Sequence, residues 1–185
     1  MHGVGHVAPA NGIRFDVDAP LLIIGAGACG LSAALAAADV GTDAIVVERD
    51  ASPSGSTSLS SGMIPAAGTA AQACANVQDS PALMARDIQA KAKGQAPQSL
   101  VDCVARASGP TIDWLANFHG VELVLVEGFL YPGHSVTRMH APASRTGAEL
   151  EAQLLKAVAQ TNAEIVTNAQ VTTLFADPNG RVSGV

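Results

Sequence analysis

Three glycines near the start of the chain have the spacing that many dinucleotide-binding proteins use. Gly25, Gly27 and Gly30 read G-x-G-x-x-G, and Glu48 follows Gly30 by 18 residues. In such a motif the first glycine permits a tight turn, the second lets the backbone approach a pyrophosphate, and the third lets a helix pack closely on a strand. An acidic side chain about 20 residues further on reaches the hydroxyls of the adenosine ribose. These residues therefore predict a dinucleotide site, which would include Ala26 between the first two glycines.

The segments around the glycines have the pattern of the elements that such a site needs. Residues 21–24 are an apolar run typical of a buried strand, and residues 31–38 are rich in Ala and Leu, which favour a helix. Gly41 ends the helical segment, and residues 44–47 form a second β-rich run. Strand, turn, helix and strand within about 30 residues predict a βαβ unit. The alternative is that the glycines serve helix packing only.

A membrane-spanning helix is a second alternative, because residues 19–38 carry no charge. About 20 apolar residues are enough to cross a bilayer. A proline and three glycines fall within the first twelve of these positions, however, and such a cluster indicates a turn. The preceding segment carries Arg14, Asp16 and Asp18 and lacks the basic start of a signal peptide. We therefore expect no membrane span.

Glu48 disfavours a site for NADP, whose additional phosphate is usually accommodated by an arginine. Arg49 directly follows Glu48 and leaves that alternative open. The other interpretation of Arg49 is a solvated surface charge.

Length and composition exclude several classes of protein. A chain of 185 residues forms one domain of ordinary size, or a domain with a lobe. The net charge of −6 and the pI near 5.2 disfavour a nucleic-acid surface, which is normally basic. Three cysteines without a C-x-x-C pair indicate reduced thiols and a cytoplasmic protein.

The histidines do not have the spacing of metal ligands. His119, His134 and His140 are too scattered along the chain to suggest one site. His2 and His6 fall within residues 1–18, which we expect to form a flexible N-terminal segment.

The stretch SPSGSTSLSSGMIPAAGT, residues 52–69, separates one class of dinucleotide protein from another. It carries no charge, is too rich in Ser and Gly for a helix and is too long for a simple turn. One interpretation is a flexible linker. Against it, Leu59, Met63 and Ile64 interrupt the polar tract, and hydroxyls with backbone amides suit a loop that wraps an anionic, planar cofactor.

At this stretch the chain resembles the FAD-dependent fumarate reductase and succinate dehydrogenase flavoprotein family, with the 3-ketosteroid dehydrogenases as more distant relatives. That family follows its ribose-binding Glu with a segment close to G-G-N-[ST]-x-x-[AS]-x-G-G-[MI]-N-A-A, and SGSTSLSSGMIPAAGT stands at the same place here. The resemblance extends over nearly the whole chain after Ala19, and its further segments are residues 79–88, 107–123, 138–157 and 168–185.

The resemblance implies an α/β fold of the Rossmann-like, glutathione-reductase type. Such a fold has a βαβ unit with a parallel sheet, a β-meander hairpin and a helical insertion. Residues 19–185 would form the N-terminal part of this FAD-binding domain, with a helical lobe at about 79–120. The implied protein is an oxidoreductase with a small-molecule substrate, in which hydride moves to or from flavin N5 on a C–C bond next to a carbonyl or carboxylate. The electron partner is not indicated.

The resemblance also implies cofactor-binding residues. Gly25, Gly27 and Gly30 would hold the pyrophosphate and Glu48 the ribose. The phosphate and flavin side would fall to the hydroxyls and backbone of the Ser-rich stretch, namely Ser56, Thr57, Ser61 and Gly62. Val171 would contact adenine through its backbone, unless it is an ordinary buried strand residue. Ser54, Ser56 and Pro65 depart from the family pattern, and Ser56 stands nearest to the histidine that carries covalent flavin in the respiratory members. Non-covalent FAD is therefore expected.

The second half of the chain predicts mostly helices before a final hairpin. Residues 80–94 form a helix with Ser80 as N-cap, Pro81 in the first position and Gly94 as its stop. Two short helices, 98–109 and 109–120, follow, each ended by a glycine, with Trp114 in the core. A strand, a turn at 132–133 and an extended segment precede a helix at 146–161, and a last strand leads to a hairpin with its turn at 177–180.

Arg138 and His140 are the candidates for the substrate side of a catalytic site. A cation and an imidazole two residues apart on an extended segment point the same way and could face a carboxylate or carbonyl near the flavin. The alternative is a solvent-exposed pair. His134 is a weaker candidate.

Members of the family continue beyond the point that corresponds to Val185. They have a closing strand, then a capping domain with the substrate clamp and a proton-donating arginine. We therefore expect a truncated FAD-binding region that is inactive alone. The alternatives are a nucleotide-binding module without turnover and an NAD-dependent dehydrogenase.

Overall fold

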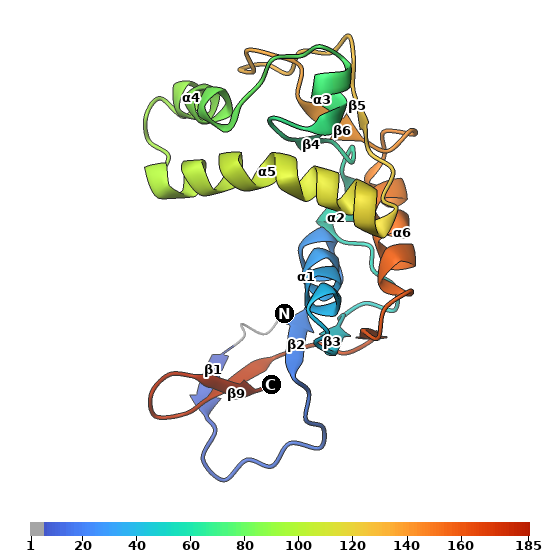
Figure 1. Ribbon diagram of the computed structural model, residues 1–185. Helices are drawn as coiled ribbons and strands as arrows, with labels where there is room; N and C mark the ends of the chain where they lie inside the picture. The colour runs from blue at the N-terminus through green and yellow to red at the C-terminus, as the bar shows by residue number, and fades with distance from the viewer. Residues whose placement is uncertain (1–5) are drawn as a thin grey trace. The chain divides into compact units, whose positions relative to one another are not determined.

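The computed structural model describes residues 6–185, which belong to two compact units (Figure 1). The first unit comprises the chain up to Gly55 together with Val158–Val185, and the second comprises Ser56–Ala157. Each unit is described by itself.

The first unit contains the predicted βαβ arrangement. Three parallel strands form a sheet in the order β2-β3-β7: β2 (Leu21–Ile24), β3 (Ala44–Val47) and β7 (Glu164–Val166). Helix α1 (Ala28–Asp39) joins β2 to β3 and buries Leu31 and Leu35 completely. The strand, helix and strand predicted from the sequence are confirmed; the turn between β2 and α1 carries Gly25 and Gly27, and Gly30 lies in the first turn of α1.

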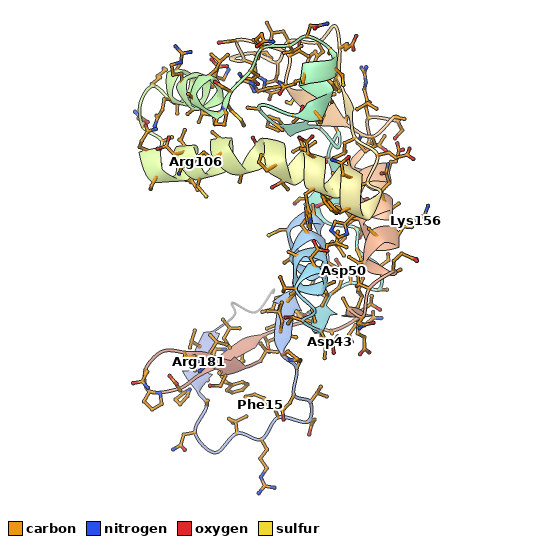
Figure 2. The ribbon with its side chains drawn as sticks, in the orientation of Figure 1. Phe15, Asp43, Asp50, Arg106, Lys156 and Arg181 are labelled. Carbon is orange, nitrogen blue, oxygen red and sulfur yellow. The ribbon has the colours of Figure 1, made fainter. Side chains whose placement is uncertain are left out.

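A second sheet of the first unit has the order β1-β8-β9, from β1 (His6–Pro9), β8 (Thr173–Ala176) and β9 (Val182–Gly184). Strands β8 and β9 form the predicted hairpin, whose turn is closed because Asp177 Oδ1 accepts hydrogen bonds from the amides of Asn179 and Arg181. The Phe15 ring meets Phe175 edge-on beside this sheet (Figure 2).

The expectation of a flexible segment at residues 1–18 is wrong for residues 6–9. These residues pair in parallel with β8, which gives their backbone groups hydrogen-bond partners, such as the amide of His6 donating to the carbonyl of Thr172. No apolar pattern in the sequence indicated this strand. Its residues do not form a buried apolar run, and Val7 is exposed. His2 lies outside the described residues.

The second unit consists of helices around a small antiparallel sheet in the order β4-β6-β5. The strands are β4 (Ile64–Pro65), β5 (Val124–Leu125) and β6 (Met139–Ala141). The helices are α2 (Ser56–Leu59), α3 (Ala70–Cys74), α4 (Pro81–Lys91), α5 (Gln98–His119) and α6 (Gly147–Val158), the last residue of which belongs to the first unit. Two apolar clusters pack the unit, one around Met84 and Ala105 and one around Val126 and Met139.

Helix α4 begins as the sequence predicts. The Ser80 hydroxyl accepts a hydrogen bond from the amide of Leu83, and Pro81 occupies the first turn. The helix ends at Lys91, and Gly94 follows with a φ of +72°. The N-terminal capping signals were therefore sufficient, whereas the helix ends three residues before the predicted stop, and Lys93 is the first left-handed residue after it.

The prediction of two short helices over 98–120 is wrong, because α5 runs through Gly109 and Pro110 without interruption (Figure 1). One buried stripe continues past the proline, through Ala105, Gly109 and Ile112. Pro110 lies on the exposed side, where the carbonyl that it leaves unpaired can reach water. Gly109 is needed for packing and does not end the helix: a Cβ there would overlap the carbonyl oxygen of Ala67. Trp114 is partly buried on this helix, with its ring centroid 4.5 Å from that of His119.

The Ser-rich stretch is ordered and includes one helical turn, α2, although its composition argued against a helix. The turn is held locally, since the Ser60 hydroxyl donates to the carbonyl of Thr57 and accepts from the amide of Gly62. The backbone carbonyl of Ser60 also accepts a hydrogen bond from the amide of Gly147. These hydrogen bonds, two local and one from a distant segment, compensate for the poor helix propensity of serine.

Within residues 6–185, no helix combines the length and the hydropathy that crossing a bilayer requires.

Candidate functional site

A hydrogen bond joins the glycine turn of the first unit to the carboxylate of Glu48. The amide of Ala26 donates to Glu48 Oε2 at 2.9 Å, and the amide of Asp50 donates to Oε1 at 3.0 Å. The amide of Gly25 donates to the carbonyl of Val47, the last residue of β3. The carboxylate is therefore fixed at the carboxyl ends of β2 and β3, where parallel sheets place their ligands.

The three glycines of the motif differ in why glycine is found at their positions. Gly25 has a φ of +93°, which L side chains rarely adopt. A Cβ on Gly30 would overlap the carbonyl oxygen of Gly25, so only glycine lets α1 pack on the turn this closely. Gly27 is the N-cap of α1 with ordinary, extended dihedral angles, so its conformation alone does not require glycine.

This arrangement fits the pyrophosphate of a dinucleotide. The first amides of a helix have no partner within the helix, and α1 has neither a side-chain cap at Gly27 nor an acidic residue in its first turn. The positive end of the helix dipole is therefore not neutralised by a nearby carboxylate in that turn. A glycine at position 27 lets an anion approach the backbone there.

The carboxylate of Glu48 fits a ribose. A carboxylate offers about four acceptor positions, and the amides of Ala26 and Asp50 use two. It can accept two ribose hydroxyls as well.

The segment before β8 lies beside Glu48. The amide of Ala169 donates to the carbonyl of Glu48 at 2.8 Å, and the amide of Asn168 donates to that of Asp50 at 3.1 Å. Val171 follows this segment and is half-buried, two residues before β8 begins, so it is not a buried strand residue. Its predicted contact with adenine stays a prediction.

Arg49 forms an exposed ion pair with its neighbour Asp50. Its Nε and terminal nitrogen donate to the two carboxylate oxygens of Asp50 at 3.1 and 3.0 Å. The hydrogen bond and charge of Asp50 raise the pKa of Arg49. The surface-charge interpretation agrees with this geometry, in which the guanidinium already has an anionic partner.

The predicted residues of the Ser-rich stretch belong to the second unit. Ser56 and Ser61 are exposed, Thr57 is half-buried and Gly62 is buried. Gly62 has a φ of +65°, and a Cβ there would lie 2.6 Å from the carbonyl oxygen of Thr146. The backbone of this turn is thus packed directly on the start of α6, which fixes the position of the serine hydroxyls beside it.

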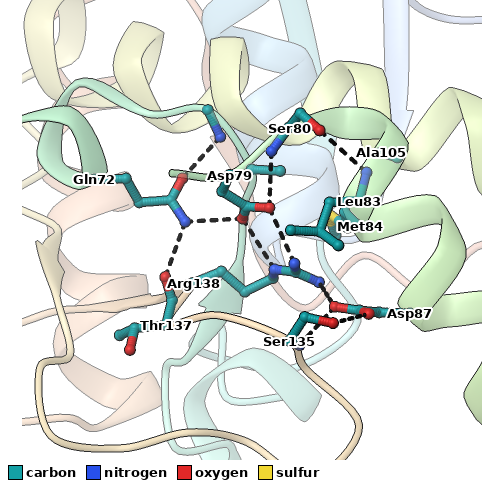
Figure 3. Close-up of polar contacts among 12 residues, drawn as sticks. Gln72, Asp79, Ser80, Leu83, Met84, Asp87, Ala105, Ser135, Thr137 and Arg138 are labelled. Atoms are coloured by element: carbon teal, nitrogen blue, oxygen red, sulfur yellow. Dashed lines mark hydrogen bonds and ion pairs between the residues drawn. The ribbon is translucent and has the colours of Figure 1, made fainter. Parts of the chain in front are cut away.

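Arg138 and His140 are buried, so the alternative of a solvent-exposed pair is wrong. The Arg138 guanidinium donates through Nε and a terminal nitrogen to both oxygens of Asp79, each at 3.0 Å (Figure 3). Its other terminal nitrogen lies 2.7 Å from Asp87 Oδ2. With two carboxylate partners, the guanidinium ties α4 and Asp79, two residues before this helix, to the residue that precedes β6. The role of Arg138 on a substrate stays a prediction.

The carboxylate of Asp87 has three polar contacts. Ser135 donates hydrogen bonds to it from both its hydroxyl and its amide, and Arg138 forms an ion pair with it. Burial raises the pKa of Asp87, but the hydrogen bonds from Ser135 and the charge of Arg138 outweigh this effect and leave the pKa below its usual value. The residue is therefore a carboxylate at neutral pH.

His140 has a partner on each ring nitrogen. A carbonyl can only accept, so Nδ1 carries the proton and donates to the carbonyl of Arg138 at 3.0 Å. Nε2 then accepts the hydroxyl of Thr69 at 2.9 Å, and that hydroxyl oxygen accepts the amide of Gln72. Burial is the main reason that the pKa of His140 is lowered. The neutral ring links β6 to the N-terminus of α3.

Acidification from pH 7.5 to 5.5 is expected to lower the free energy of unfolding. In this range the unfolded chain protonates His140 near the ordinary pKa of about 6.5, whereas the folded chain resists protonation, so stability falls as the pH falls. Urea unfolding followed by Trp114 fluorescence at each pH measures the change. His140→Gln should show a smaller loss between the two pH values, and the exposed His6→Gln should keep the wild-type loss. Equal pH dependence in all three proteins would contradict this account.

Several residues of these networks were missed in the sequence. Asp79 and Asp87 were not recognised as partners of Arg138, although Asp87 stands on the face of α4 that also carries Met84 and Ile88. An acidic residue on the apolar face of a helix indicates a buried partner. Thr69 and Gln72 form a capping box, for which the T-x-x-Q pattern was a signal. The contacts of Asn168 and Ala169 are backbone contacts and had no signal in the side chains.

Comparison with known proteins identifies the family of the chain. The FAD binding domain family matches residues 21–185. A fumarate reductase (cytochrome) of Shewanella frigidimarina is 28% identical over 167 residues, which cover 89% of this chain and 29% of the relative. A urocanate reductase of Eggerthella lenta is 29% identical over 176 residues, 95% of this chain and 28% of the relative.

A solved structure shows the same fold. The 3-ketosteroid-Δ4-(5α)-dehydrogenase of Rhodococcus jostii RHA1 superposes with a TM-score of 0.81 at 23% identity, over 97% of this chain and 44% of that chain. The chain thus spans 28–29% of the length of the two relatives and under half of this structure. The resemblance to fumarate reductases and ketosteroid dehydrogenases is confirmed: the chain belongs to the FAD binding domain family, and its cofactor is FAD.

Proposed function

We propose that this chain is the FAD-binding region of a flavin-dependent oxidoreductase that reduces or oxidises a C–C bond next to a carboxylate or carbonyl. The observation that carries the proposal is the Glu48 carboxylate, fixed by the amide of Ala26 at the mouth of the glycine turn. The names of two relatives support the substrate class, because fumarate and urocanate are both carboxylates conjugated to a C=C bond. FAD, when bound, supplies hydride transfer at its N5 atom.

The residues of the first unit bind and orient the cofactor in this proposal. Glu48 accepts the ribose hydroxyls, the backbone at Gly27 and the start of α1 take the pyrophosphate, and the segment before β8 offers Val171 to adenine. An ionised carboxylate at this position accepts ribose hydroxyls but repels a 2′-phosphate, which favours FAD over NADP.

For the Ser-rich stretch, the proposal assigns its hydroxyls and backbone to the phosphate and flavin side of the cofactor. Ser56 and Ser61 are exposed on a turn whose Gly62 packs directly on the backbone of Thr146, just before α6. A turn fixed in this way holds donors in place without reorganisation on binding. Ser56 offers no nucleophilic imidazole for a covalent flavin link, so the FAD is non-covalent in this proposal.

An absorption spectrum of the purified chain over the ultraviolet and visible range tests cofactor binding, before and after addition of FAD and desalting, with NAD as the control. We expect flavin absorbance to remain after desalting and NAD to be lost. Hydride transfer is then tested with a reduced viologen dye as electron donor and fumarate or urocanate as acceptor, in a protein that also contains the sequence which follows this region in the relatives. If FAD is retained but neither acid oxidises the dye, the cofactor assignment stands and the proposed substrate class is wrong.

Glu48→Gln is expected to weaken FAD binding about tenfold or more. The change keeps one oxygen acceptor but removes the charge, and hydrogen bonds to a charged group are worth about 1.5–3 kcal/mol. Fluorescence quenching of FAD on titration with the apoprotein measures the affinity. Glu164→Gln, on an exposed position of β7 in the same unit, is the matched control and should leave the affinity unchanged. Equal affinities for all three proteins would exclude Glu48 as the ribose ligand.

A further inference from the structure

The second unit contains a cavity that the proposed function does not use. It has a volume of about 300 Å³ and lies between the C-terminal half of α4 and the turn at residues 131–134. Its lining includes Ile88, Lys91, Ala92, Tyr131, Pro132 and His134. This volume is at the lower end of small-molecule pockets, and a cavity of about 150 Å³ already holds benzene, so a single ring with a substituent fits.

The walls of this cavity are fixed and mostly apolar. The amide of His134 donates to the carbonyl of Tyr131 at 2.9 Å, which closes the turn. The rings of Tyr131 and His134 lie 5.3 Å apart between centroids, tilted by 44°. The stem of Lys91 packs on Gly133, where a Cβ would lie 3.1 Å from the lysine Cδ. The aliphatic stem of Lys91 is therefore part of the wall, while its ammonium lies beyond the stem.

One charged group of the lining is available to a ligand. Lys91 is exposed, and its ammonium has no ion-pair partner within residues 6–185. Asp87 differs from it because Ser135 and Arg138 already occupy its two oxygens. His134 Nδ1 is buried, so a ligand in the cavity meets the ring of His134 and not this nitrogen.

We propose that this cavity binds a small carboxylic acid with a single ring. The ring packs against Tyr131 and Ile88, and the carboxylate accepts from the ammonium of Lys91. A carboxylate matches this cation, whereas a cationic ligand would find only the occupied oxygens of Asp87. This site is separate in sequence from Gly25, Glu48 and the Ser-rich stretch, and the inference does not rest on the proposed function.

Tyr131 makes the test direct, because it is the only tyrosine of the sequence. The FAD-loaded chain, labelled on tyrosine, is titrated with benzoate while the NMR signals of the ring are followed. We expect one set of signals that shifts and saturates, with a dissociation constant on the order of 1 mM, which is usual for so small a ligand. The neutral benzyl alcohol serves as the second probe.

Lys91→Gln keeps the stem on Gly133 and removes the charge. It should weaken benzoate about two- to fivefold, as expected for an exposed charge pair, and leave benzyl alcohol unchanged. Lys93→Gln is the matched control, since Lys93 is exposed two residues away and does not line the cavity. Tyr131 signals that do not move up to about 20 mM benzoate would overturn the proposal, as would equal effects of the two lysine variants. The flavin absorbance of the same samples reports FAD binding, so failure here is distinguishable from failure of the proposed function.

Discussion

Replacing Arg138 by methionine is expected to lower the free energy of unfolding by about 3–5 kcal/mol. The side chain is fully buried and has two carboxylate partners, Asp79 and Asp87, of which Asp79 is also fully buried (Figure 3). Removal of the guanidinium would leave both charges without their cation in a low-dielectric interior. Urea unfolding followed by the fluorescence of Trp114, which belongs to the same unit, measures the loss.

Two further variants separate a lost ion pair from a lost side chain. Arg106→Met removes an exposed arginine of α5 (Figure 2) and should change the stability by less than about 0.5 kcal/mol. The triple variant Arg138→Met, Asp79→Asn, Asp87→Asn removes the unpaired charges and should recover part of the stability lost in the single variant. If the triple variant is no more stable than Arg138→Met, packing rather than charge accounts for the effect.

Gly30→Ala is expected to abolish retention of FAD through desalting. A Cβ at this position overlaps the carbonyl oxygen of Gly25, a backbone atom that cannot rotate away, so α1 must move off the turn. Such overpacking costs typically about 1–3 kcal/mol of stability. The movement also displaces the first amides of α1 from the pyrophosphate, so affinity for FAD should fall more than tenfold. Flavin absorbance after desalting and thermal unfolding measure the two effects.

Gly55→Ala is the control for this prediction. It precedes α2, has no positive φ and has no atom within 4 Å of the position of an added Cβ. We expect it to retain FAD and to unfold at the wild-type temperature. Retention of FAD by Gly30→Ala at wild-type affinity would show that the helix does not need this close contact to bind the cofactor.

The buried networks of the second unit were not predictable from the sequence. Arg138 and His140 stood out as a cation and an imidazole two residues apart, but their environment depends on α3 and α4, which lie far away in the sequence. The continuity of α5 likewise depends on contacts with a segment far away in the sequence. Gly109 and Pro110 are strong local signals for a helix end, yet tight packing on Ala67 and the exposure of the proline allow one helix.

What the sequence alone determined is the local part of the cofactor site. Glycine spacing, apolar runs and capping residues act over a few residues, because they reflect steric limits on φ and the periodicity of helices and strands, and they located β2, α1, β3 and the start of α4. The tertiary structure decided which groups meet across the chain: Ala169 at Glu48, Asp79 and Asp87 at Arg138, and Thr69 at His140. These contacts depend on burial and on the exclusion of water between distant segments, which no local pattern of residues specifies.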